Sequence, residues 1–477
     1  MAGSRGDTIP LSGPSFSKGS GRQSLPVPRP DPRRATPGEV MSTADTIFAL
    51  ATGAGRSAVA VLRLSGPGCG AVLDRLAGRR PAARMATLRT LRDAAGAALD
   101  RALVLWFPGP RSYTGEDAAE LHLHGGRAVV AAVSEALVAA GARVAEPGEF
   151  TRRAFLHGRM DLTEAEGIAD LIEAETEAQR RQALRQTGGA LAREARGWAE
   201  QLTRLLAQQE AALEFAEEGL PSDLDEVVRA GAGALRAEIA AALADGGRGE
   251  RLREGLDVAI LGAPNVGKSS LLNALTGREA AIVSARAGTT RDVVEARFDL
   301  AGVPATLADT AGLREGADEI EAEGIRRAHR RGEEADIVLA VFAADTAPDA
   351  ETLALLARRD CVVVANRCDL AEPAADYAGV VPLRVSARTG TGLAALRARL
   401  EEEAERRAGG AALLTRPRHR AALEEVARHL AGAETAPVPE LASEGLRAAS
   451  LALGRLTGRV GVEQVLDVVF GSFCIGK

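Results

Sequence analysis

The residues best suited to chemistry lie in one short segment, residues 262–269. They read Gly-Ala-Pro-Asn-Val-Gly-Lys-Ser and match the phosphate-binding pattern GxxxxGK[ST]. In this pattern glycines let backbone N–H groups turn toward the phosphates, and the following helix presents the positive end of its dipole. Lys268 would reach the β- and γ-phosphate oxygens, and the Ser269 hydroxyl would bind Mg²⁺. An apolar strand at 258–261 precedes the segment, so the context also predicts a nucleotide-binding loop.

Two other segments supply groups that respond to the third phosphate. Residues 309–312 read Asp-Thr-Ala-Gly and follow an apolar strand at 305–308. We expect the Asp309 carboxylate to hold the water shell of the Mg²⁺, and the Gly312 N–H to sense the γ-phosphate. Residues 288–292 read Gly-Thr-Thr-Arg-Asp and place a threonine hydroxyl on a loop that can fold over the metal.

The order of the motifs is that of a GTPase domain. Asn366-Arg367-Cys368-Asp369 and then Ser386-Ala387-Arg388 follow at the ends of later strands. Asp369 can accept hydrogen bonds from the N1–H and N2 amine of guanine. Adenine lacks this pair of donors and would leave the carboxylate unpaired, so GTP is favoured over ATP.

Three positions depart from the usual GTPase motifs. Arg367 and Arg388 stand where lysine is common, in keeping with a chain whose lysines are only residues 18, 268 and 477. Leu313 follows the Asp-Thr-Ala-Gly motif, where Ras-like enzymes carry the glutamine that orients the attacking water. Hydrolysis therefore needs another source of catalysis.

Length and composition limit the class of protein. At roughly 150 residues per domain, 477 residues predict about three folding units. Hydrophobic residues make up 46% and charged residues 26%, which is typical of a globular protein. The net charge of −6 argues against a protein that coats nucleic acid with a broad basic surface. With no membrane-length apolar stretch and no signal peptide, we expect a cytoplasmic protein with no membrane contact.

The first part of the chain is predicted to contain an extension and a small domain. Residues 1–40 are rich in proline, lack hydrophobic periodicity and predict a disordered N-terminal extension; translation from Met41 is a hypothesis here. Residues 41–160 alternate between strands and helices and predict an α+β domain. Its predicted elements are strands at 59–64, 103–107 and 119–124 and a helix at 127–140.

The rest of the chain predicts a helical domain interrupted by an α/β domain. Residues 161–254 are helical in pattern, and Thr163 with Glu166 has the spacing of a capping box at their start. Strands and helices alternate regularly over 255–405, as in a doubly wound parallel sheet. Residues 406–477 are helical again. The simplest architecture inserts the α/β domain between two halves of one all-α domain.

Polar residues alternate along the strand at 119–124. Glu120, His122 and His124 would share one face of that strand. Three residues in line span too far to close a zinc shell unaided, so a polar ligand pocket fits better than a metal site. The four cysteines are scattered and favour neither a disulfide framework nor a zinc ribbon.

Taken together, these residues resemble one family, the tRNA-modification GTPases MnmE, also called TrmE. The resemblance spans about residues 45–477, and includes the GTPase motifs themselves. The other stretches that carry it are 45–47 (Asp-Thr-Ile), 61–66 (Val-Leu-Arg-Leu-Ser-Gly), 106–110 (Trp-Phe-Pro-Gly-Pro), 114–117 (Thr-Gly-Glu-Asp), 147–151 (Pro-Gly-Glu-Phe-Thr) and 473–477 (Phe-Cys-Ile-Gly-Lys).

The resemblance implies a function in tRNA modification. Residues 41–160 would bind a 5-formyl- or methylene-tetrahydrofolate and form a homodimer. With the flavoprotein MnmG, as a heterotetramer, the protein would add an aminomethyl or carboxymethylaminomethyl group to C5 of the wobble uridine in certain tRNAs. The implied folate contacts are Arg63, Glu120, Arg159 and Lys477. The third is lysine in some members of the family.

The resemblance also implies how hydrolysis is activated. A potassium ion bound by Asn265, Ser284, Arg286 and Thr289 would take the place of an arginine finger when two GTPase domains dimerise. Glu321 would orient the attacking water, and Ser269 and Thr290 would bind Mg²⁺. The implied nucleotide contacts are Asn265, Val266, Gly267, Lys268, Ser269, Ser270, Ser284, Ala285, Arg286, Ala287, Gly288, Thr289, Thr290, Asp309, Thr310, Ala311, Gly312, Asn366, Arg367, Asp369, Ser386, Ala387 and Arg388.

Two other functions compete with this one. A regulatory GTPase switch in ribosome assembly would carry an RNA-binding module such as a KH domain after the GTPase domain, but the sequence there is helical. A folate-binding protein with a degenerate GTPase domain conflicts with the intact Lys268, Ser269, Asp309 and Asp369.

Overall fold

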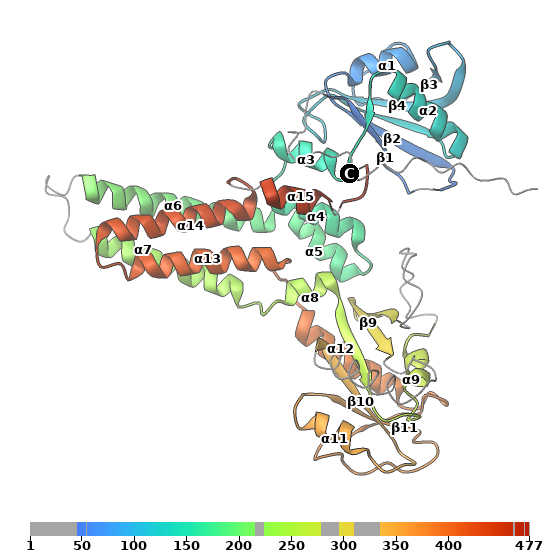
Figure 1. Cartoon of the computed structure of the whole chain (residues 1–477), viewed down its shortest axis with the longest axis vertical. Coiled ribbons are helices and arrows are strands. Elements are labelled where there is room, and N and C mark those ends of the chain that lie inside the picture. Colours follow the sequence, from blue (N-terminus) through green and yellow to red (C-terminus); the bar gives the residue numbers. More distant parts are fainter. Residues whose placement is uncertain are drawn as a thin grey trace, which may run out of the picture. The chain divides into compact units, whose positions relative to one another are not determined.

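The computed structural model describes residues 45–53, 55–214, 224–277, 295–309, 334–460, 463–471 and 473–476. Over these residues the chain forms two six-stranded sheets and a set of long helices (Figure 1). The predicted fold class, with α+β, all-α and α/β parts, is confirmed. The predicted N-terminal extension and Met41 lie outside the described residues. No helix among the described residues has the length and apolar character needed to cross a membrane.

The first sheet belongs to the N-terminal α+β part. Its strand order is β3-β4-β5-β2-β1-β6, with β6 parallel to β1 and the other neighbours antiparallel. Its elements are β1 (Ile47–Leu50), β2 (Val59–Ser65), α1 (Cys69–Ala77), β3 (Thr87–Arg92), β4 (Ala98–Phe107), β5 (Ala118–His124), α2 (Arg127–Ala139), β6 (Arg143–Val144) and α3 (Glu149–Leu156). The three predicted strands are confirmed as parts of β2, β4 and β5, and the predicted helix as α2, which ends one residue earlier than predicted.

The two faces of this sheet differ in chemistry. Helices α1 and α2 pack on one face, where Leu62, Leu121 and Leu123 are buried. Because side chains alternate along a strand, Arg63 and Glu120 project from the opposite face. These two residues are directly paired in register between β2 and β5. The sheet therefore sets a charged pair on the face that α1 and α2 leave uncovered.

The helical part combines two segments of the chain, one before the second sheet in the sequence and one after it. Helices α6, α7, α13 and α14 lie side by side (Figure 1) and share one apolar core. Trp198, Leu202 and Leu446 are buried there, as helical spacing predicts. The helices are α4 (Leu162–Glu173), α5 (Glu177–Thr187), α6 (Ala190–Glu214), α7 (Leu224–Leu243), α8 (Arg248–Glu254), α13 (Pro417–Glu434), α14 (Pro439–Thr457) and α15 (Glu463–Gly471).

The capping box predicted at Thr163 and Glu166 is wrong by two residues. Asp161 is the N-cap of α4 and accepts from the Glu164 N–H, while the Glu164 side chain accepts from the Asp161 N–H. Thr163 donates instead to the Asp161 carboxylate at 2.7 Å. Asp161 with Glu164 and Thr163 with Glu166 have the same spacing in sequence. Glu166 is instead used by buried partners on α13, so it is not available for capping.

Glu166 is the centre of a buried ionic cluster between α4 and α13. Its carboxylate accepts from both Arg418 and His419, and its side chain is 1% exposed. Burial opposes its ionisation, but the hydrogen bond of His419 and the hydrogen bonds and charge of Arg418 prevail and hold its pKa far below the ordinary value. Burial lowers the pKa of His419, so the ring stays neutral, donating from Nε2 to Glu166.

A second ionic contact ties together the two points where the chain enters and leaves the α/β part. Asp170 on α4 pairs with Arg253, at the end of α8, and with Arg416, just before α13. The Nε–Oδ1 distance to Arg253 is 3.0 Å, and the Nη2–Oδ1 distance to Arg416 is 2.6 Å. One carboxylate on α4 thus fixes both connecting segments.

The second sheet is the α/β part. Its order is β12-β11-β10-β7-β9-β8, parallel except for the antiparallel β8 at the edge. Its elements are β7 (Leu256–Leu261), α9 (Lys268–Leu275), β8 (Glu295–Leu300), β9 (Val303–Asp309), β10 (Ile337–Ala343), α11 (Ala350–Leu356), β11 (Val362–Asn366), β12 (Leu383–Arg384) and α12 (Leu393–Ala408).

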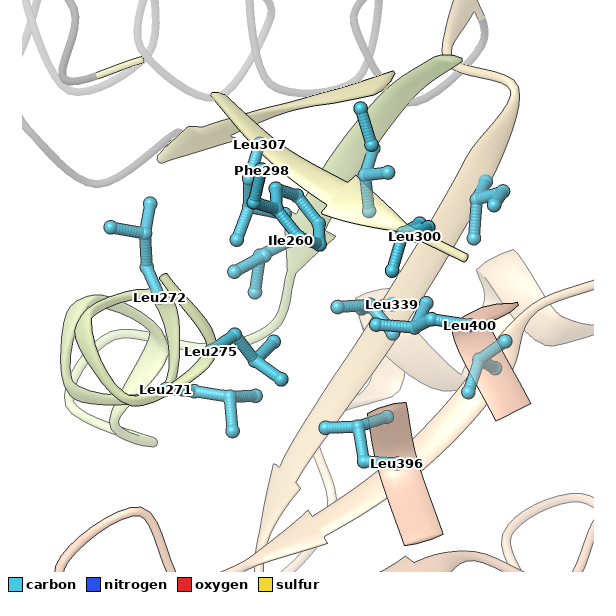
Figure 2. Close-up of a cluster of buried hydrophobic side chains, with 14 of the residues drawn as sticks. Ile260, Leu271, Leu272, Leu275, Phe298, Leu300, Leu307, Leu339, Leu396 and Leu400 are labelled. Carbon is cyan, nitrogen blue, oxygen red and sulfur yellow. The ribbon is translucent and has the colours of Figure 1, made fainter. Parts of the chain in front are cut away.

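Apolar side chains cover both faces of this sheet. On one face Leu271 and Leu275 of α9 and Leu396 of α12 point toward Ile260 and Leu339 of the strands (Figure 2). On the other face residues of α11 contact apolar residues of β10 and β11. Coverage of both faces explains why the central strands are continuous apolar runs. Because β7, β10 and β11 are parallel, their carboxyl ends lie at the same edge of the sheet.

We predict that Glu166→Ala strongly destabilises the protein. The substitution leaves the Arg418 guanidinium and the His419 ring without their shared acceptor, and breaking a buried pair in this way costs about 3–5 kcal/mol. Urea unfolding at pH 7 measures the loss. Arg236→Ala is the control, because its pair with Glu434 is exposed and worth about 0.2–1 kcal/mol.

The pH dependence of that loss checks its origin. The folded-state pKa of Glu166 is depressed, so its contribution is present above an unfolded-state pKa of about 4.3 and is lost as the pH falls below it. The difference in unfolding free energy between wild type and Glu166→Ala should shrink progressively below about pH 4. A difference independent of pH would contradict an ionic origin.

Candidate functional site

The phosphate-binding loop joins β7 to α9 and depends on two glycines. Gly267 is the N-cap of α9 with a φ of 96°, and Gly262 has a φ of 154°. A Cβ at Gly262 would overlap the Val341 carbonyl, and one at Gly267 would overlap the Asn366 amide nitrogen. Lys268 Nζ donates to the carbonyls of Gly262 and Ala263, each at 2.8 Å. The loop therefore holds its lysine over its own concave side.

Asn366 connects this loop to the guanine motifs. It ends β11 and is 2% exposed. Its Nδ2 donates to the Val266 carbonyl at 2.9 Å, and its Oδ1 accepts from the Ala387 N–H at 3.1 Å. One buried amide thus links the end of β11, the phosphate-binding loop and the loop after β12.

Arg367 adds a second link to the phosphate-binding loop. Its backbone is left-handed, with a φ of 61°. Its guanidinium donates to the Asn265 carbonyl and pairs with Asp345 at 3.2 Å. Asn265 is itself left-handed, with a φ of 62°. Arginine at this position therefore contacts two loops at once, which a single lysine ammonium does less readily.

Both oxygens of the guanine-motif carboxylate accept hydrogen bonds from side chains of the next motif. Asp369 Oδ1 accepts from the Ser386 hydroxyl at 2.5 Å, and Oδ2 accepts from Arg388 Nη2 at 2.6 Å and Nε at 3.1 Å. These hydrogen bonds, that of Ser386 first, hold the pKa of Asp369 below its ordinary value. The group is therefore ionised at neutral pH, the state that accepts hydrogen bonds.

A second polar cluster lies on the uncovered face of the N-terminal sheet. Arg63 donates to Glu120 Oε1 from Nη2 at 2.9 Å and lies 5.5 Å from the ring centre of Tyr113. His122 Nε2 lies 3.3 Å from Glu120 Oε2. Burial opposes ionisation of Glu120, but Arg63 and then His122 prevail and lower its pKa. The cluster thus presents an anionic acceptor held by a cation.

Two further segments approach the same strands. Arg159 is exposed, and its stem lies against Gly115, two residues from Tyr113. At the C-terminal end, Ile475 forms an antiparallel bridge with Pro147, and Gly476 packs against the carbonyl of Leu50 at the end of β1. The residues just before Lys477 therefore contact the N-terminal sheet.

The structure brings together only part of the predicted site. Asp309 ends β9 in register with Ile260, but its side chain lies outside the described residues. Also outside them are Ser284, Ala285, Arg286, Ala287, Gly288, Thr289, Thr290, Thr310, Ala311, Gly312, Glu321 and Lys477. Within the described part of the chain no group of histidine, cysteine, aspartate or glutamate side chains is arranged to hold a metal ion.

Sequence reasoning missed several of these contacts. It did not identify Tyr113 beside Arg63, nor Asp345 as the partner of Arg367. Asp345 follows β10 at the same edge as the motifs, so its position at a strand end was an available signal. Nothing in the sequence marked Tyr113.

These features define a P-loop GTPase. The sheet is mostly parallel and covered on both faces, a phosphate-binding loop follows its first strand, and an acidic guanine motif follows β11. Comparison with protein families narrows this class. Residues 46–159 match the model described as the GTP-binding protein TrmE N-terminus, and residues 162–474 match the MnmE helical domain.

Similar proteins cover nearly the whole chain. The tRNA modification GTPase MnmE of Gluconacetobacter diazotrophicus is 60% identical over 437 residues, 90% of this chain and 98% of the relative. That of Granulibacter bethesdensis is 52% identical, covering 91% of this chain and 99% of the relative. The chain belongs to the MnmE family of tRNA modification GTPases and is a GTP hydrolase. Membership in this family decides against the ribosome-assembly switch.

Solved structures cover smaller shares of the chain than these relatives do. The G domain of the Thermotoga maritima FeoB iron transporter is 29% identical, with 31% of this chain and 98% of that chain covered. Aquifex aeolicus Era bound to GDP and aluminium fluoride is 26% identical, with 31% and 56% covered. Both TM-scores are 0.25.

We predict that Gly267→Ala weakens GDP binding by roughly tenfold or more, because the new methyl group displaces Asn366 and breaks its two hydrogen bonds. Gly277→Ala is the matched control, since a Cβ there meets nothing nearer than the Ala274 carbonyl at 3.9 Å. Titration with a fluorescent GDP analogue measures both variants. Equal affinities for the two would contradict the role given to the Gly267 backbone.

Proposed function

We propose that the protein couples GTP hydrolysis to modification of tRNA, acting with the flavoprotein MnmG. The modification adds an aminomethyl or carboxymethylaminomethyl group to C5 of the wobble uridine, with a tetrahydrofolate as the carbon donor. The observation that carries this proposal is the presence of two separate polar sites, one at the phosphate-binding loop and one at Arg63 and Glu120. A GTPase alone has no need of the second site.

The division of labour follows the proposed domain boundaries. Residues 41–160 bind folate and dimerise, 255–405 hydrolyse GTP, and 161–254 with 406–477 form the helical domain. Residues 1–40 stay outside these domains. The shared core of α6, α7, α13 and α14 supports the two-part helical domain, and the pairs of Asp170 support its boundaries with the GTPase domain.

The proposed nucleotide contacts are the set named from the sequence, residues 265–270, 284–290, 309–312, 366, 367, 369 and 386–388. In the described part, Lys268 would exchange the Gly262 and Ala263 carbonyls for phosphate oxygens. Mg²⁺ would be held by Ser269 and Thr290; Ser269 is exposed in the first turn of α9, which fits this role. The metal supplies neutralisation of charge on the phosphates.

Potassium is proposed as the activator that replaces the absent glutamine. Asn265, Ser284, Arg286 and Thr289 would hold it, with Glu321 orienting the water. Asn265 is exposed and has a left-handed backbone, and its carbonyl accepts from Arg367. This hydrogen bond uses the backbone and leaves the side-chain amide available as a ligand. An amide oxygen is a suitable ligand for such a hard cation.

The proposed folate site is Arg63, Glu120, Arg159 and Lys477. The ionised Glu120 can accept from the N–H donors of a pterin ring, and Arg63 fixes its position. Arg159 can pair with a carboxylate of the ligand. The contacts of Ile475 and Gly476 support delivery of Lys477 to the same sheet.

Partners and location complete the proposal. The working assembly is a homodimer that combines with MnmG into a heterotetramer in the cytoplasm, with tRNA as substrate. The net charge of −6 supports a shared RNA surface, because a chain with this charge supplies little electrostatic attraction for RNA overall.

We predict that GTP hydrolysis is faster in potassium than in sodium at equal ionic strength, on the order of tenfold or more, because a cation beside the phosphates offsets transition-state charge. Glu321→Ala should lose most of the activity in potassium. Steady-state phosphate release measures both effects. Equal slow rates in the two salts would overturn potassium activation while leaving the GTPase assignment intact.

We predict that Arg63→Ala weakens binding of 5-formyltetrahydrofolate by about tenfold or more, because Glu120 loses the charged hydrogen bonds that orient it. Arg101→Ala is the control, as Arg101 is an exposed arginine of the same sheet. Isothermal titration calorimetry gives both dissociation constants. Wild-type affinity in Arg63→Ala would remove Arg63 and Glu120 from the folate site.

A further inference from the structure

Arg388 occupies the acceptor that a guanine base would need. Guanine offers two adjacent donors on one edge, N1–H and the exocyclic N2 amine, which together match the two oxygens of a carboxylate. In the structure both donors of Arg388 that reach Asp369 go to Oδ2, at 2.6 and 3.1 Å. The Ser386 hydroxyl takes only one position on Oδ1. One oxygen is therefore open to the base and the other is taken.

The two partners differ in how easily they can separate. The Asp369 side chain is 13% exposed, whereas that of Arg388 is 75% exposed. Ser386 is fully buried and its hydroxyl also accepts from the Thr389 N–H, so it stays in place. Arg388 is thus the member of the cluster whose separation costs least burial, and turning its guanidinium away from Asp369 frees Oδ2 while the Ser386 hydrogen bonds stay in place.

We propose that Arg388 is a specificity-determining residue that substitutes for the N2 amine of guanine at Asp369. Guanine binds with both donors only when the guanidinium leaves Oδ2. A base that lacks the N2 amine uses Oδ1 alone and leaves Arg388 in its place. The proposal rests on the proposed guanine contact of Asp369 and deepens it by naming the group with which the base competes.

This arrangement has a consequence for nucleotide choice. Hypoxanthine, the base of IDP, carries N1–H but has no N2 amine. In wild type, binding of GDP replaces the Arg388 hydrogen bonds to Asp369 Oδ2 with one from the N2 amine of guanine. Binding of IDP leaves the Arg388 hydrogen bonds in place. Without Arg388, GDP forms the amine contact and breaks no hydrogen bond of the protein. Bound IDP then leaves Asp369 Oδ2 without a partner from the protein or the base. Removing Arg388 should therefore increase the preference for GDP over IDP.

Lysine would not have the same effect. The arginine reaches Oδ2 through Nε and Nη2 together, and this fork holds the guanidinium in one orientation. A lysine ammonium offers one donor position on a flexible stem and competes less with the amine. Arg388→Lys should give a GDP preference between those of wild type and Arg388→Ala.

The test is competition of GDP and of IDP against a fluorescent GDP analogue, using the full-length protein. Exposed ion pairs of this kind are worth up to about a fivefold change in binding, so we expect the ratio of IDP to GDP dissociation constants to rise about threefold in Arg388→Ala. Arg384→Ala is the matched control, an exposed arginine of β12 that pairs with Glu372. It should leave the ratio at the wild-type value.

A second variant separates this proposal from the assignment beneath it. Asp369→Asn should weaken GDP binding by at least about tenfold, since a charged acceptor is lost. If Asp369→Asn weakens GDP binding but Arg388→Ala leaves the ratio unchanged or lowers it, the role of Arg388 is overturned and the guanine contact stands. Wild-type GDP affinity in Asp369→Asn would overturn both.

Discussion

The nucleotide site depends on one buried amide, that of Asn366. Its nitrogen fixes the Val266 carbonyl and its oxygen fixes the Ala387 N–H, so three loops that are far apart in sequence share one side chain. The Asn366 amide fills the space that a Cβ at position 267 would occupy, so the position requires glycine. Buried amides with both ends paired hold a single orientation, and here that orientation sets the spacing between the phosphate and guanine ends of the site. The sheet edge brings these loops together, and Asn366 aligns them.

The helical part applies the same principle on a larger scale. A carboxylate on α4 joins the segments through which the chain enters and leaves the inserted domain, and the Glu166 cluster holds α4 against α13. Buried charges give little net stability but penalise any packing that leaves them unpaired. The apolar core of the inserted part includes Leu252 of α8, so α8 contributes to that core as well as to the Asp170 pairs.

Much of this organisation was predictable from the sequence. Apolar runs followed by Gly262 or Asn366 identified strands with functional residues at their ends, and the order of motifs identified the GTPase fold. Alternation placed Glu120 on a polar face, yet only the register between β2 and β5 shows that Arg63 is its partner. Thr163 with Glu166 and Asp161 with Glu164 fit the same capping-box pattern, so spacing alone does not distinguish them. Pairs such as Arg388 with Asp369 depend on side-chain geometry that spacing does not specify.

Asn366 joins the phosphate-binding loop to the guanine loops through two hydrogen bonds of one side chain. Amide hydrogen exchange in the nucleotide-free protein tests this link directly, at the Ala387 N–H that donates to Asn366. We expect this amide to be protected in wild type and to exchange at least about tenfold faster in Asn366→Ala, while core amides of β11 keep their protection. Equal exchange of Ala387 in the two proteins would contradict the claim.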